Sequence, residues 1–174
     1  MISQKYQIQL LSKHHDKHSF SCGVAELDQY LSQRAGQDKR RCVAATYVLT
    51  DNGSEQAIIG YYTLSATSIE LTELSEQVAK KLPRYPLIAA TLLGRLAVDK
   101  NYHGNGYGEL LLADALKRSL KISDSVASFS VIAEAKNNNV SKFYEKYGFV
   151  QFPDHKQRLF LPMITIKQAF KHGK

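Results

Sequence analysis

The feature that most constrains the fold is an apolar run over residues 87–98 that leads directly into a glycine-rich turn. Arg95 is the one charged residue in this run, and a stretch this apolar predicts a central strand buried on both faces. After the turn, Leu112, Leu116 and Leu120, together with Ala113, recur at helical spacing and predict an amphipathic helix. A buried strand, a glycine turn and a helix in this order predict a sheet covered by helices.

The rest of the chain alternates between the same two kinds of pattern. Strand-like patterns are expected over residues 6–12, 43–49, 58–64, 126–135, 149–152 and 158–166. Helical patterns are expected over residues 24–35, 71–82 and 138–147, the last of them ended by Gly148. The Asn52–Gly53 pair between two apolar runs predicts a hairpin. This order of elements predicts a mixed α/β fold.

Length and composition indicate one soluble globular domain. The chain has 174 residues, of which 44% are hydrophobic and 22% charged, so we expect a single domain over 1–174. No apolar run approaches the ~18 residues that a membrane helix needs. We expect no signal peptide at the start of the chain, and hence a cytoplasmic protein in which Cys22 and Cys42 are reduced, small apolar side chains.

The charge balance favours an anionic partner. Lys and Arg number 23 and Asp and Glu 16, which gives a net charge of +7. Such a balance suits a phosphate-bearing cofactor, a nucleic acid or an acidic protein, and does not choose among them. The basic run at 39–41, with Arg34, is either a solvated face or a nucleic-acid contact. His14 and His18 are spaced like metal ligands on a helix, but with no third ligand we expect a polar turn and no metal.

The glycines at 104, 106 and 108 are the strongest chemical signal. Glycine allows close approach of the backbone to a ligand, and a helix that begins there presents free N–H groups to it. This arrangement suits a phosphate or a pyrophosphate, with Lys100 and His103 adding positive charge. The spacing matches neither the dinucleotide fingerprint nor the P-loop. A flexible turn without a ligand is the alternative.

The segment Arg95–Gly108 resembles the coenzyme A signature of the GNAT superfamily of N-acetyltransferases, Q/R-x-x-G-x-G/A. Gly106 and Gly108 match it, whereas His103 stands where Gln or Arg is usual. His can still donate a hydrogen bond, but the departure affects the expected strength or pH dependence of binding. The resemblance implies that acetyl-CoA is held by Leu96, Ala97, Val98, His103, Gly104, Asn105, Gly106, Tyr107 and Gly108.

Further blocks narrow the resemblance to the GNAT toxins of type II toxin–antitoxin systems. The opening F-x-C-G-x-x-x-L-D/N-x-F/Y-L pattern of those toxins is matched by residues 20–31, and four more blocks match in order: 60–65, 93–99, 143–149 and 158–162. The resemblance implies an acetyl-CoA-dependent N-acetyltransferase that acetylates the α-amine of aminoacyl-tRNA and blocks translation.

The same resemblance implies a fold and a set of partners. The expected fold is the GNAT acyltransferase fold, in which helices flank a mixed, mostly antiparallel central sheet whose splayed central strands hold acetyl-CoA. The expected partners are aminoacyl-tRNA, a ribbon-helix-helix antitoxin and, only through the antitoxin, DNA. A homodimer is a further option. Neither a membrane nor a metal is expected.

Acetyl transfer from a thioester needs a neutral amine, a stabilised oxyanion and a proton for the leaving thiolate. An α-amine has an unperturbed pKa of about 7.7–8.0, so no strong general base is required. Backbone N–H groups near residues 96–98 are expected to serve the oxyanion. Tyr144 matches the tyrosine of the family and is the candidate general acid, although its apolar helical stripe also suits a core residue.

Several neighbouring residues are weaker candidates. Phe143 borders Tyr144 and is the better core candidate, with the cofactor as its other contact. Asn137 either reaches the pantetheine arm or caps the helix that follows. Glu134 orients a water or the amine, or is a solvated strand end. Weak substrate contacts are expected from Arg95, Arg40 and Arg41, of which Arg95 needs an anionic partner if buried.

Two other functions remain open from the sequence. One is a GNAT enzyme that acetylates a protein N-terminus, a polyamine or a small-molecule amine. The other is a module that binds coenzyme A or an antitoxin without turnover.

Overall fold

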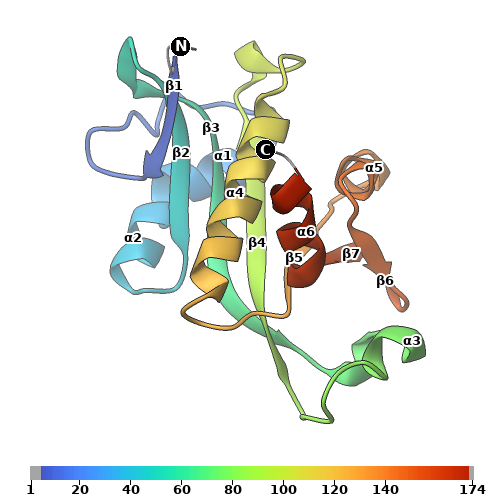
Figure 1. Ribbon diagram of the computed structural model, residues 1–174. Coiled ribbons are helices and arrows are strands. Elements are labelled where there is room, and N and C mark those ends of the chain that lie inside the picture. The colour runs from blue at the N-terminus through green and yellow to red at the C-terminus, as the bar shows by residue number, and fades with distance from the viewer. Residues whose placement is uncertain (1–4, 173–174) are drawn as a thin grey trace. The chain divides into compact units, whose positions relative to one another are not determined.

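A computed structural model describes residues 5–172 of the chain (Figure 1). Met1–Gln4, on which the expectation of no signal peptide partly rests, lie outside the described residues. The strands are β1 (Tyr6–Leu10), β2 (Ala45–Asp51), β3 (Ser54–Ile69), β4 (Ile88–Val98), β5 (Ser130–Glu134), β6 (Val150–Phe152) and β7 (His155–Pro162). The helices are α1 (Ala25–Gln29), a π-helical turn (Tyr30–Arg34), α2 (Ala35–Arg40), α3 (Glu76–Ala79), α4 (Tyr107–Ser123), α5 (Asn138–Lys146) and α6 (Met163–His172).

The seven strands form one mixed sheet in the order β1-β2-β3-β4-β5-β7-β6. The β1–β2, β2–β3, β5–β7 and β6–β7 pairs are antiparallel, whereas β4 and β5 run parallel. The expected mixed, mostly antiparallel sheet is therefore confirmed. The parallel register runs from Thr91 opposite Val131 to Leu93 opposite Ala133, and β4 continues beyond the last residue paired with β5 to Val98.

The chain divides into two compact units, each with its own apolar core. The first comprises residues 1–65 and 95–115, and the second comprises residues 66–94 and 116–174. The core of the first unit contains Leu11, Phe20, Cys22, Tyr30, Leu31, Ala35, Val48, Ile58, Tyr61 and Ala97. The core of the second contains Ile69, Leu74, Ile88, Ala90, Ile132, Phe152 and Phe160.

Gly60 on β3 marks a close approach within the first unit. A Cβ at this position would lie 2.7 Å from Leu111 Cδ1 and 2.8 Å from the carbonyl oxygen of Ala97. We expect Gly60→Ala to lower the free energy of unfolding by about 1–3 kcal/mol, because one of the two contacts is backbone that cannot turn aside. Urea unfolding measures the change. Gly53→Ala, whose Cβ would lie 3.5 Å from the nearest atom, is the control, and equal stability of the two variants would contradict the prediction.

Three elements differ in length or type from what the sequence predicts, and they are the segments expected over residues 71–82, 126–135 and 158–166. The helix expected over 71–82 is wrong in extent: a 3₁₀ turn (Leu71–Glu73) is followed by the four-residue α3. The two are separate because Ser75 is extended and its hydroxyl caps α3 by accepting from the Val78 N–H. The strand expected over 126–135 begins only at Ser130, after an exposed Val126.

The strand expected over 158–166 is wrong at its end. β7 stops at Pro162, and Met163 begins α6. Met163 and Ile166 are buried while Ile164 is 68% exposed, which is a helical rather than an alternating pattern of burial. None of the helices within the described residues combines the length and the apolar character that a membrane crossing requires.

Candidate functional site

The glycine loop between β4 and α4 leaves open space above its backbone. Gly104 and Gly106 have φ values of +77° and +81°, which favour glycine, and a Cβ added at either position would meet no atom within 4 Å. The loop borders a cavity of about 290 Å³ lined by Leu96, Ala97, Val98, Tyr102, His103, Gly104, Gly106, Tyr107 and Gly108. Eight of the residues expected to hold acetyl-CoA thus line one cavity in the first unit.

Helix α4 begins at Tyr107, within this loop. It is a 17-residue helix whose first N–H groups, starting at Tyr107, have no partner within the helix and carry the positive end of its dipole. The Tyr107 hydroxyl donates to Tyr6 Oη over 2.6 Å, and the Tyr107 ring makes edge contacts with Tyr6 and Tyr102. The hydrogen bond to Tyr6 raises the pKa of Tyr107 to about 12. These contacts fix the loop in a form that fits a pyrophosphate.

His103 and Asn105 bind the backbone of the loop itself. His103 Nε2 lies 2.7 Å from the carbonyl oxygen of Val98, so this nitrogen carries the proton and donates. The Asn105 side-chain amide donates to the carbonyls of Tyr102 and His103 over 3.2 and 3.1 Å. Asn105 does not line the cavity, and the structure gives both side chains a role in the shape of the loop.

Asp99 and Tyr102 are parts of this loop that sequence reasoning missed. The buried Asp99 carboxylate accepts from the backbone N–H groups of Ser21 and Asn101 over 3.0 and 2.9 Å. These hydrogen bonds tie the glycine loop to the block at residues 20–31. The sequence signal that could have identified Asp99 is its place in another matching block, residues 93–99. Tyr102 lines the cavity but lies between the residues of the coenzyme A signature.

The Arg95 guanidinium lies over the Tyr30 ring at 3.5 Å from its centroid. The aromatic face supplies a partner for this cation, and whether Arg95 also faces a phosphate of the substrate stays a prediction. The Tyr30 hydroxyl in turn donates to Asp38 over 2.8 Å. Arg40 and Arg41 are exposed at the end of α2, and whether they contact substrate stays a prediction.

Helix α5 in the second unit carries the candidate acid. Asn137 caps the helix by accepting from the Val140 N–H over 3.0 Å, so the capping alternative holds in the structure. The expectation that Phe143 is more core-like than Tyr144 is wrong, because Tyr144 is 4% exposed whereas Phe143 is only half-buried. The spacing of α5 points residue 144 inward, where its ring packs against Phe149 at 5.1 Å. Burial raises the pKa of Tyr144 and keeps its phenol protonated.

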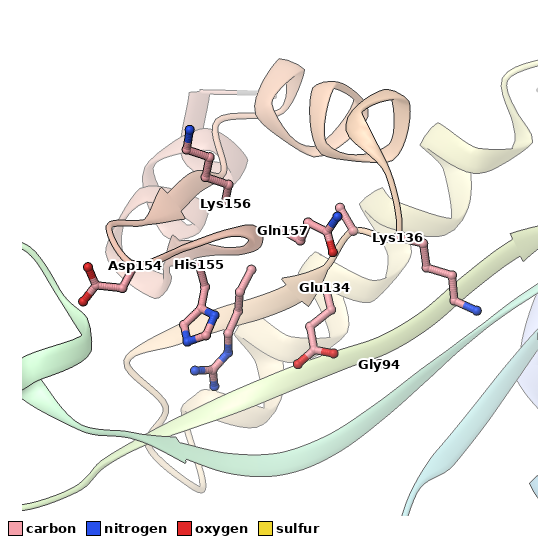
Figure 2. A pocket seen from close by; sticks show the side chains of 9 residues that line it. Gly94, Glu134, Lys136, Asp154, His155, Lys156 and Gln157 are labelled. Carbon is pink, nitrogen blue, oxygen red and sulfur yellow. The ribbon is translucent and has the colours of Figure 1, made fainter.

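A second, strongly charged cavity lies in the second unit (Figure 2). It has a volume of about 680 Å³ and is lined by Gly94, Glu134, Ala135, Lys136, Asp154, His155, Lys156, Gln157 and Arg158. Arg158 forms an ion pair with Glu73, and its guanidinium lies 4.8 Å from the centroid of the Phe152 ring. Of the residues that we singled out, only Glu134 lies here.

The expected cofactor and catalytic residues therefore fall into two groups, the end of β4 with the glycine loop in the first unit and the end of β5 with α5 in the second, while Arg40 and Arg41 lie apart at the end of α2. Within residues 5–172, His, Cys, Asp and Glu side chains do not gather into a group of three or more that could hold a metal ion. His14 and His18 do not share a helical face but lie in a turn, and the buried His15 between them accepts at Nδ1 from the Ser12 N–H over 2.9 Å.

The sheet and the glycine loop are those of an α/β protein whose glycine-lined cavity lies at the N-terminus of a long helix. Residues 43–151 match the family described as the acetyltransferase (GNAT) domain, and the chain belongs to this family. The expected fold class and the expected class of enzyme, an acetyltransferase, are confirmed.

Two relatives are similar over most of their length. One is a protein of Sinorhizobium fredii named "Probable toxin TacT", 29% identical over an alignment of 160 residues that covers 88% of this chain and 88% of the relative. The other is a protein of Mycobacterium tuberculosis named "tRNA-acetylating toxin", 30% identical over 148 residues, which are 85% of this chain and 86% of the relative.

Solved structures of two further toxins are also similar. A tyrosine-to-phenylalanine variant of KacT is 30% identical with a TM-score of 0.89, over 96% of this chain and 100% of KacT. AtaT in complex with acetyl-methionyl-tRNAfMet is 30% identical with a TM-score of 0.87, over 95% and 99%. A tyrosine-to-phenylalanine variant of AtaT bound to the C-terminus of the antitoxin AtaR and to acetyl-CoA is 26% identical with a TM-score of 0.82, over 97% and 99%.

Proposed function

We propose that this acetyltransferase is a toxin that transfers the acetyl group of acetyl-CoA to the α-amine of aminoacyl-tRNA and so blocks translation. The observation that carries the proposal is the open glycine loop at the start of α4, residues 103–108, which we call the glycine cradle. The relative named "tRNA-acetylating toxin" supports it. The net charge of +7 suits a polyanionic substrate.

The residues of the cradle fit the pyrophosphate of acetyl-CoA, since the two positive-φ glycines leave room that a side chain would fill. Acetyl-CoA supplies an activated thioester. The α4 N–H groups and the Gly104–Gly108 backbone bind the phosphates, and backbone N–H groups at the end of β4, residues 96–98, serve the thioester oxygen as its charge develops. His103 and Asn105 keep the loop in its binding form.

Tyr144 is the general acid of this proposal. The neutral α-amine attacks the carbonyl carbon, the carbon–sulfur bond breaks as the amide forms, and the amine proton leaves to water. The Tyr144 phenol gives its proton to the departing sulfur and recovers one from water. Burial favours this role because it keeps the phenol neutral at working pH.

Control by an antitoxin completes the proposal. The relative AtaT binds the C-terminus of its antitoxin AtaR, and we propose that a cognate ribbon-helix-helix antitoxin neutralises this chain and alone brings it to DNA. We propose that the protein acts in the cytoplasm, and a homodimer is one option for its assembly. A short neighbouring gene with a ribbon-helix-helix pattern would support this part of the proposal.

The test is incubation of the purified protein with labelled acetyl-CoA and charged tRNA. Label on the aminoacyl group is the expected result, and deacylated tRNA is the control. Label on a protein N-terminus, a polyamine or a small amine but not on tRNA would favour the alternative acceptors. Binding of acetyl-CoA with no turnover on any amine would favour the non-enzymatic module.

A further inference from the structure

The charged cavity of the second unit contributes nothing to the acetyl-CoA cradle, because all of its lining residues differ from those of the glycine loop. Two carboxylates, Glu134 and Asp154, line it together with the basic or imidazole side chains of Lys136, His155, Lys156 and Arg158. Figure 2 shows the Asp154 carboxylate on the far side of His155 from Glu134. A ligand that suits both signs of charge must itself carry a cationic group close to anionic ones.

The backbone places these groups side by side. Glu134 ends β5, and its Cα is the register partner of Arg158 on β7. Glu134 and Lys136 are two residues apart, and Figure 2 shows their side chains extending to the same side, toward the strand that carries Gly94, with the His155 ring also on that side. Figure 2 also shows Lys156 pointing away from Glu134.

The positions of Arg158 and Lys136 are restricted by neighbouring residues of the fold. Arg158 is held between the Glu73 carboxylate and the Phe152 ring, and is only half exposed. Lys136 immediately precedes Asn137, the cap of the helix that carries Tyr144. The rim of the cavity therefore continues directly into α5, the element to which we assign the acid.

We propose that this cavity receives the aminoacyl end of the charged tRNA. Glu134 takes the α-amino group in its ammonium form on arrival, and Lys136, His155 and Arg158 take the phosphates of the single-stranded end of the RNA. The inference rests on the proposed function and deepens it. A free polyamine would face three repelling groups here, and a purely anionic ligand would face Glu134.

Matched substitutions test the assignment. Lys136→Gln and Lys171→Gln remove the same charge, one from the lining of the cavity and one from the exposed end of α6, outside that lining. Glu134→Gln removes the carboxylate without changing its size. The readouts are KM and kcat with charged tRNA and with methionine methyl ester, an aminoacyl ester that has no phosphate, together with tRNA binding measured by fluorescence anisotropy.

We expect Lys136→Gln to raise KM for charged tRNA about three- to tenfold, with no change for the methyl ester. The slope of log affinity for tRNA against log salt concentration becomes shallower by about 0.7 for each phosphate that is no longer neutralised. Glu134→Gln raises KM for both acceptors by a similar factor. Lys171→Gln changes neither, and thermal unfolding of all three variants checks that the fold is intact.

The inference is overturned if Lys136→Gln and Glu134→Gln behave like Lys171→Gln with both acceptors. Failure of the proposed function is a different result: wild-type protein that binds charged tRNA but transfers no acetyl group to it. In that case the anisotropy series still decides whether the cavity holds the tRNA end.

Discussion

Tyr144→Phe is expected to lower kcat for acetyl transfer by about 10²- to 10³-fold and to leave KM for acetyl-CoA nearly unchanged. The substitution removes one oxygen and keeps a ring that is 4% exposed among apolar neighbours. General acid catalysis typically contributes about 10²–10⁴-fold, so the loss measures proton transfer to the leaving sulfur. If the phenol of Tyr144 had only a structural role, Tyr144→Phe would change the free energy of unfolding instead of kcat.

Steady-state kinetics with charged tRNA gives the first readout, and urea unfolding gives the second. Tyr85→Phe, at a tyrosine that is 63% exposed, is the control and should leave both unchanged. A Tyr144→Phe variant with wild-type kcat would remove Tyr144 from the mechanism. A variant that loses stability and activity together would assign it to the core.

The pH profile gives an independent check on the same residue. A tyrosine has an ordinary pKa of about 10, and burial raises that of Tyr144 further. The acid therefore stays protonated while the α-amine, with a pKa of about 7.7–8.0, loses its proton. The rate should rise with pH through the pKa of the amine and then level off, and a fall between about pH 8 and 9.5 would contradict a buried phenol as the acid.

The starting residue of α5 explains why the sequence predicted the wrong order of burial for Phe143 and Tyr144. Hydrophobicity favours phenylalanine for the core, but α5 begins at Asn138 after a fixed cap, and that phase turns residue 144 inward. The start of the helix had to be known to within one residue to see it.

The glycine loop could be predicted because its chemistry resides in backbone conformation, which glycine spacing encodes directly. What the sequence could not supply were the long-range ties: Asp99 to the Ser21 backbone, and the Tyr107 hydroxyl to Tyr6. Such pairs are far apart in the chain, and neither partner belongs to a pattern with a period. The charged cavity was missed for the same reason, since β7 brings Arg158 opposite Glu134 only through sheet register.

Gly106→Ala is expected to raise KM and Kd for acetyl-CoA about ten- to hundredfold, because the backbone at this position has a φ of +81°. An L-residue in the left-handed region costs about 1–2 kcal/mol, and the new methyl group would project into the open space that we assign to the pyrophosphate. Nothing lies within 4 Å of that methyl group, so the variant should fold while its cradle is strained or partly filled.

Isothermal titration with acetyl-CoA separates this effect from chemistry, since binding needs no acceptor. Gly36→Ala on α2, outside the positive-φ glycines, is the control and should bind acetyl-CoA like the wild type. Because the cradle serves the donor and not the acceptor, KM for charged tRNA should hardly change in Gly106→Ala. If this variant bound acetyl-CoA with wild-type affinity, the phosphates of acetyl-CoA would not bind at the glycine cradle. The thioester sulfur that Tyr144 is proposed to protonate would then also lie elsewhere.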